Sequence, residues 1–134
     1  MDGDFWLMEN DIGNKMQLLV YRVPKKNHNA MIKLAKEFYD VIGKMGDSPR
    51  AEIFQLDNIG TPMEGITNIA NTVSANQDEE VWVEILSYSD RKHMDEYCEK
   101  CKNDESMDRL WQKFVNLGTP GTSLIMGDFS RLRV

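Results

Sequence analysis

Hydrophobic positions along the chain change their spacing several times, and each change marks an expected element. Residues 16–23 are rich in β-branched and aromatic side chains and end at Pro24, a combination typical of a strand. Apolar residues then recur at spacings of three and four between Met31 and Met45. This spacing predicts an amphipathic helix that begins after a cap at Asn27 and ends at Gly46.

The middle of the chain predicts two further strands separated by a long connection. Residues 51–57 alternate weakly and predict a strand that suits the edge of a sheet. Residues 58–79 contain Gly, Pro and Asn without a sustained period. This segment is either a functional loop or one that hides a hairpin or a short helix near 66–73. Residues 80–88 carry the strongest strand pattern of the chain.

The next segment predicts two consecutive helices. Ser89 or Asp90 can cap the first helix, a break at 103–104 separates it from the second, and Gly118 suits the end of the second. The side chains expected to face inward are Met94, Tyr97, Cys98 and Cys101 in the first helix, and Met107, Leu110, Trp111, Phe114 and Leu117 in the second.

A turn at 119–122 and a strand over 123–132, interrupted at 127–128, complete the pattern. The resulting order is β-α-β-β-α-β, with the second helix divided in two. This order predicts an α+β, ferredoxin-like fold with a four-stranded antiparallel sheet. The first and third strands then lie at the centre of the sheet, and the helices cover one face.

The length of 134 residues predicts one domain, which we place at 16–134, preceded by an acidic N-terminal arm at 1–15. The formal net charge of -6 argues against a nucleic-acid partner, and no apolar run is long enough to cross a membrane. The acidic start lacks the pattern of a secretory signal, so we expect a cytoplasmic protein.

The central strands are apolar on both faces, although helices can cover only one of them. We assign the uncovered face to Leu19, Tyr21, Trp82, Leu86 and Tyr88. Such a patch is unusual on a soluble monomer, so the sequence predicts a homodimer packed sheet to sheet. Alternatively, residues 1–15 and the 58–79 segment fold over this face.

Glu84 is the sharpest candidate for chemistry, because it interrupts an otherwise apolar strand. Partial desolvation would raise its pKa, which suits a general base or a ligand-pairing acid. Tyr21, Trp82 and Tyr88 lie on the same predicted face and could form an aromatic wall for a planar ligand. The alternatives are an ion pair between Glu84 and Arg22, Arg131 or a partner-chain residue, a solvated position for Glu84, and ordinary packing of the aromatic rings.

Cys98 and Cys101 form a Cys-x-x-Cys motif, but both fall in the middle of the expected helix. A redox motif needs its first cysteine at a helix N-terminus, and a structural zinc site needs four ligands. We therefore interpret the pair as core residues and expect no metal and no cofactor. His28 and His93 have no visible catalytic partner in the sequence.

Four short segments spread over roughly residues 16–133 resemble those of a known family. They are Val-Pro-Lys-Lys-Asn at 23–27, Gly-Ile-Thr-Asn at 65–68, Asp-Glu-Glu-Val at 78–81 and Met-Gly-Asp-Phe at 126–129. On these segments the chain resembles the dimeric α+β barrel proteins and, within them, the family labelled domain of unknown function 1428. The resemblance implies the fold and a homodimer, and it implies no particular activity.

Three functions remain open from the sequence. The first is a small-molecule-binding protein whose ligand, small and apolar or aromatic, lies between the sheet and the 58–79 segment. The second is a cofactor-independent enzyme of the oxygenase or isomerase type, which rests on fold analogy. The third is a protein-interaction module that uses the acidic surface or the N-terminal arm.

Overall fold

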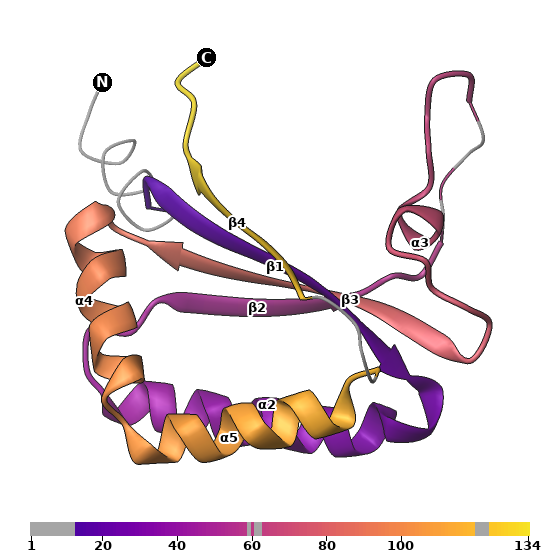
Figure 1. The fold of residues 1–134 in the computed structure, drawn as a ribbon. Helices are drawn as coiled ribbons and strands as arrows, with labels where there is room; N and C mark the ends of the chain where they lie inside the picture. The colour runs from indigo at the N-terminus through magenta and orange to yellow at the C-terminus, as the bar shows by residue number, and fades with distance from the viewer. Residues whose placement is uncertain (1–12, 59, 61–62, 120–123) are drawn as a thin grey trace.

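The computed structural model describes residues 13–58, 60, 63–119 and 124–134 (Figure 1). Over these residues the chain forms a four-stranded antiparallel sheet and four helices, an α+β architecture. The elements are β1 (Lys15–Pro24), a 3-10 turn η1 (Lys25–Asn27), α2 (His28–Lys44), β2 (Arg50–Gln55), α3 (Ile69–Thr72), β3 (Glu79–Tyr88), α4 (Arg91–Lys102), α5 (Glu105–Leu117) and β4 (Ile125–Ser130). Residues 1–12 of the expected arm and 120–122 of the expected turn lie outside the described residues.

The strand order is β2-β3-β1-β4, so β1 and β3 occupy the centre of the sheet and β2 lies at an edge, as predicted. The register pairs Leu19 with Glu84 and Tyr21 with Trp82. The predicted interruption of the last strand is wrong. β4 continues through Gly127 and Asp128, because the ladder with β1 pairs them with Leu18 and Gln17.

Short polar side chains start the two C-terminal helices. Asp90 accepts a hydrogen bond from the His93 backbone N–H at 2.8 Å, and Asp104 accepts one from the Met107 N–H at 2.9 Å. These are ordinary N-cap contacts. Asn27 occupies the cap position of α2, but its side chain instead donates a hydrogen bond to the Leu117 carbonyl at 2.9 Å. It therefore joins the start of α2 to the end of α5.

Helices α2, α4 and α5 lie along one side of the sheet (Figure 1). The core forms between these helices and the sheet face that carries Leu19, Tyr21, Trp82, Leu86 and Tyr88. The prediction that these five residues form the uncovered face is therefore wrong. Because side chains alternate along a strand, the opposite face is the one left free of the long helices.

The opposite face is also rich in apolar side chains. Leu18 and Ile85 pair across β1 and β3, and Phe54 pairs with Val83 at the β2 edge. Phe54 is 51% exposed, and Ile125 and Phe129 of β4 are similarly open. The 58–79 segment contains the short helix α3 and reaches this face where Ile69 shares a shallow hollow with Phe54 and Val83.

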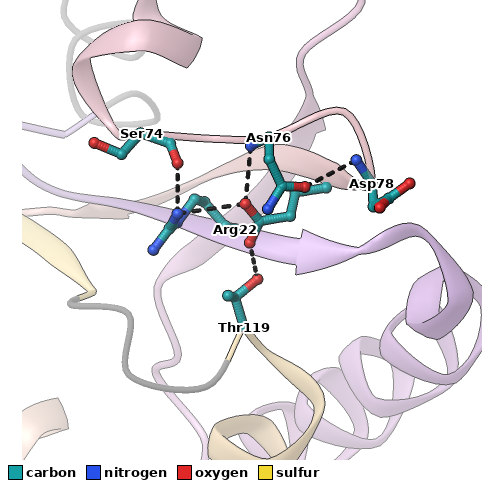
Figure 2. A network of polar contacts seen from close by, with 6 residues as sticks. Arg22, Ser74, Asn76, Asp78 and Thr119 are labelled. Carbon is teal, nitrogen blue, oxygen red and sulfur yellow. Dashed lines mark hydrogen bonds and ion pairs between the residues drawn. The ribbon is translucent and has the colours of Figure 1, made fainter.

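A polar network closes one end of the sheet (Figure 2). The Arg22 guanidinium donates to the Ser74 carbonyl at 2.6 Å and lies 3.3 Å from the Glu79 carboxylate. Glu79 also accepts hydrogen bonds from the Asn76 N–H and the Thr119 hydroxyl. Burial acts to raise the pKa of Glu79, but these hydrogen bonds and the Arg22 charge outweigh it and hold the pKa below its usual value.

Candidate functional site

A cavity of about 260 Å³ lies between the sheet and helices α2, α4 and α5. Most of its wall is apolar and includes Leu19, Leu34, Ile53, Leu86 and Phe114. Two exposed wall residues, Cys98 and the 42% exposed Trp111, mark where the cavity reaches the surface. An apolar cavity with a few polar groups is the usual form of a small-molecule site.

Glu84 places its carboxyl group in this cavity. It lies in β3 between Leu19 of β1 and Ile53 of β2, which are its cross-strand partners on both sides. Within the described residues it makes no hydrogen bond and no ion pair. Burial in these apolar surroundings raises the pKa of Glu84 from 4.5 to about 7. The carboxyl group can therefore hold or release a proton near neutral pH.

The four residues proposed from the sequence share the sheet face that packs against the helices, but they do not all reach the cavity. Tyr21 and Glu84 line it, and the Tyr21 ring meets Phe114 edge to face with centroids 4.9 Å apart. Trp82 instead lines a neighbouring hollow with Tyr39. Tyr88 is fully buried beyond the cavity wall, where its hydroxyl donates to Gln17 Oε1 at 3.0 Å.

The cavity is on the other side of the sheet from the predicted location. The sequence placed the ligand between the sheet and the 58–79 segment, whereas the cavity lies under α2, α4 and α5. One alternative considered for Glu84, an ion pair with Arg22, is contradicted, because Arg22 pairs with Glu79. Arg22 and Glu84 lie on opposite faces of the sheet. Glu84 shares a face with its partner Leu19, and Arg22 is three positions further along the same strand as Leu19, so its side chain points to the other face.

Cys98 and Cys101 were expected in the core, and both line the cavity. Cys101 packs partly buried against the core, as predicted, whereas Cys98 is exposed and its core assignment is wrong. The pKa of each thiol is raised, mainly by burial. The Tyr97 hydroxyl forms a hydrogen bond with Cys101 that acts in the opposite direction, but burial outweighs it. The two thiols therefore stay protonated at neutral pH. Within the part of the chain that the structure describes, no group of three or more His, Cys, Asp or Glu residues could hold a metal ion.

Both histidines have structural partners away from the cavity. The Ser89 backbone N–H donates to His93 Nδ1 at 3.0 Å, so the opposite nitrogen, Nε2, donates to the Asp47 carbonyl at 2.6 Å. His28 Nδ1 lies 2.7 Å from Glu80 Oε1. Neither ring lines the cavity described above.

Sequence reasoning missed several wall residues that the helices contribute. Tyr97 and Cys98 from α4, and Trp111 from α5, face the same space as Gln17 of β1. Their helical spacing identified an inward stripe but could not show that this stripe leaves a cavity. The alternation of Gln17 with Leu19 and Tyr21 could have shown that a second polar side chain, besides that of Glu84, lies on this face.

Comparison with known proteins places the chain in a family without adding an activity. No curated protein matches it. None of the helices in the described part of the chain combines the length and the hydropathy of a membrane-spanning segment. The model of the family described as "Protein of unknown function (DUF1428)" matches residues 15–116, which span β1 to most of α5. Because this match covers most of the sequence, the chain belongs to the DUF1428 family of proteins of unknown function.

Proposed function

We propose that the protein binds a small apolar or aromatic molecule in the cavity beside Glu84, and that it does so as a homodimer of ferredoxin-like α+β barrel subunits in the cytoplasm. The observation that carries the proposal is the cavity itself, which is apolar apart from a few groups and contains one partly buried carboxyl group, that of Glu84. An interaction module would need no open interior, so the cavity favours ligand binding.

The size of the cavity limits the ligand. An engineered protein cavity of about 150 Å³ holds one benzene molecule. The cavity here measures about 260 Å³, which suits one ring with a short substituent or a fused pair of rings. Phe38, Trp111 and Phe114 supply aromatic surface for such a ring.

The strand order β2-β3-β1-β4, with helices on one side, supports the ferredoxin-like assignment. The apolar free face of the sheet supports the dimer. Its centre holds the half-buried Leu18, Val83 and Ile85, and its edges hold the exposed Phe54, Ile125 and Phe129. An apolar face that is open to this extent is costly on an isolated chain. A second copy placed sheet to sheet by a two-fold axis would cover it.

Binding can be tested with benzene, toluene and indole, measured by ligand-observed NMR and calorimetry. The variant Ala35→Leu adds bulk to the cavity wall on α2, and Ala30→Leu adds the same bulk at an exposed position of that helix. We expect at least one probe to bind the wild type and Ala30→Leu alike, and to bind Ala35→Leu at least tenfold more weakly. Absence of binding by all three probes, or equal binding to the two variants, would contradict the proposal.

A second candidate, a cofactor-independent enzyme, is favoured by the pKa of about 7 at Glu84. A carboxylate with this pKa can remove a proton from a bound substrate at neutral pH. The test follows α-hydrogen exchange of acetophenone in D₂O, in which Glu84 takes the proton and returns a deuteron. Exchange that is faster with wild type than with Glu84→Gln supports this candidate, and equal rates contradict it.

A further inference from the structure

The charge of the cavity wall restricts what the cavity can accept. None of the described residues that line it is Lys, Arg or His. The ionisable groups in the wall are all acidic and come from three elements. They are Tyr21 of β1, Glu84 of β3, and Tyr97, Cys98 and Cys101 of α4.

Acidic groups also surround the wall. Tyr39 of α2 and Tyr88 of β3 interact electrostatically with Glu84, and Asp128 of β4 interacts with Cys98. From α5 the cavity receives Met107, Trp111 and Phe114, which carry no charge. An anionic ligand would therefore lie against Glu84 without a balancing cation in the wall.

Arg91 of α4 acts electrostatically on Cys98 in the cavity wall, and its charge favours the thiolate. Its guanidinium is exposed and lies 3.2 Å from the carboxylate of Asp95, one helical turn away. Because the Arg91–Asp95 pair has no net charge and lies in solvent, Arg91 does not compensate the charge of the partly buried Glu84 carboxylate.

We propose that the natural ligand of this cavity is an amine carried on a small apolar ring, with its ammonium group paired to the Glu84 carboxylate. This inference rests on the proposed function and names the class of its ligand. Glu84 has no protein partner among the described residues, so an ammonium group would supply the missing counter-charge. The oxygens of Gln17 and Tyr97 in the same wall are further acceptors for the three ammonium hydrogens.

Protonation of Glu84 links this pairing to pH. Its pKa of about 7 means that the carboxylate is present above neutral pH, whereas an alkylamine stays charged up to about pH 10. The affinity for the amine is therefore highest between about pH 7 and pH 10, where both groups are charged. Below pH 7 the affinity falls about tenfold for each pH unit, because Glu84 is protonated. A neutral ligand does not require the carboxylate, so its affinity does not fall in this way.

Three probes of similar size separate the possibilities: benzylamine, toluene and benzoate, titrated by calorimetry and NMR at pH 8 and pH 6. We expect wild type at pH 8 to bind benzylamine at least tenfold more tightly than toluene, and benzoate most weakly. The variant Glu84→Gln should lose the preference for benzylamine while it still binds toluene, which shows that its cavity is intact. Glu52→Gln removes a carboxylate of β2 on the opposite sheet face and should behave as wild type.

The outcomes distinguish this inference from the function on which it rests. If wild type binds toluene as tightly as benzylamine, or if Glu84→Gln keeps the preference for benzylamine, the amine inference is overturned and the binding function stands. If none of the three probes binds wild type, both are overturned.

Discussion

The indole N–H of Trp82 donates a hydrogen bond to Glu80 Oε1 at 2.8 Å, from a side chain that is 1% exposed. The same oxygen lies 2.7 Å from His28 Nδ1, and the rings of His28 and Trp82 meet edge to face. Glu80 therefore connects the first residue of α2 to the largest side chain of the central strand. Through this contact a partly buried carboxylate helps to position the helix that forms one cavity wall.

Removal of the Glu80 carboxylate should destabilise the protein, because the buried indole N–H then loses its acceptor. We expect Glu80→Ala to lower the free energy of unfolding by roughly 1–3 kcal/mol. Glu80→Gln keeps an acceptor oxygen and should cost less. Urea unfolding followed by tryptophan fluorescence measures both, and equal stability of wild type and Glu80→Ala would contradict the role assigned to this contact.

The stability of the protein should depend on pH through Glu84. Its pKa is about 7 in the folded state and 4.5 in the absence of burial, so the unfolded chain ionises first as pH rises. The protonated Glu84 carboxyl group therefore contributes its full stabilisation below pH 4.5. As pH rises from 4.5 to 7, this contribution is lost, and the free energy of unfolding falls by about 3 kcal/mol. Glu84→Gln cannot ionise and should lack this loss, so it should be more stable than wild type at pH 8.

Denaturant unfolding of wild type and Glu84→Gln between pH 4 and pH 8 measures the difference directly. Glu52→Gln, on the opposite face of the sheet, is the control and should follow the wild-type profile. Parallel profiles for wild type and Glu84→Gln would show that Glu84 is not buried as described.

Two glycines should respond in opposite directions to the same substitution. Gly13 has φ of +84°, and a Cβ there would overlap the Tyr88 carbonyl, so Gly13→Ala should destabilise the start of β1. Gly43 lies in α2 with open space around it, so Gly43→Ala should stabilise by about 0.5–1 kcal/mol. Thermal unfolding checks both, and a stabilising Gly13→Ala would contradict the backbone geometry.

The proposed dimer should depend on the free face of the sheet. Phe54→Lys places a charge on this face at a position that is already half exposed, so it should weaken association without unfolding the chain. Ile32→Lys, on an exposed position of α2, is the matched control. Light scattering after size-exclusion chromatography gives the masses, and a wild-type mass equal to one chain would contradict the dimer.

The positions of the secondary-structure elements were predictable from the sequence because their signals are local. The run of β-branched and aromatic residues along 80–88 and the period of three to four from Met31 to Met45 indicate β3 and most of α2 without reference to the rest of the chain. Asp90 likewise indicated the start of α4. The interruption predicted at 127–128 failed because the pairing of β4 with β1 depends on a partner strand distant in sequence.

The sequence by itself also determined that Glu84 is exceptional, since a carboxylate in the middle of an otherwise apolar strand segment needs a physical reason. It did not determine which face of the sheet receives the helices. Both faces of β1 and β3 are apolar, so a period of two assigns Glu84 to the side of Trp82 and Leu86 but leaves open what covers that side. The tertiary structure decided this by packing α2, α4 and α5 over the face with the larger aromatic side chains. Burial of that face then left the carboxyl group of Glu84 in an apolar cavity, where it has no protein partner among the described residues.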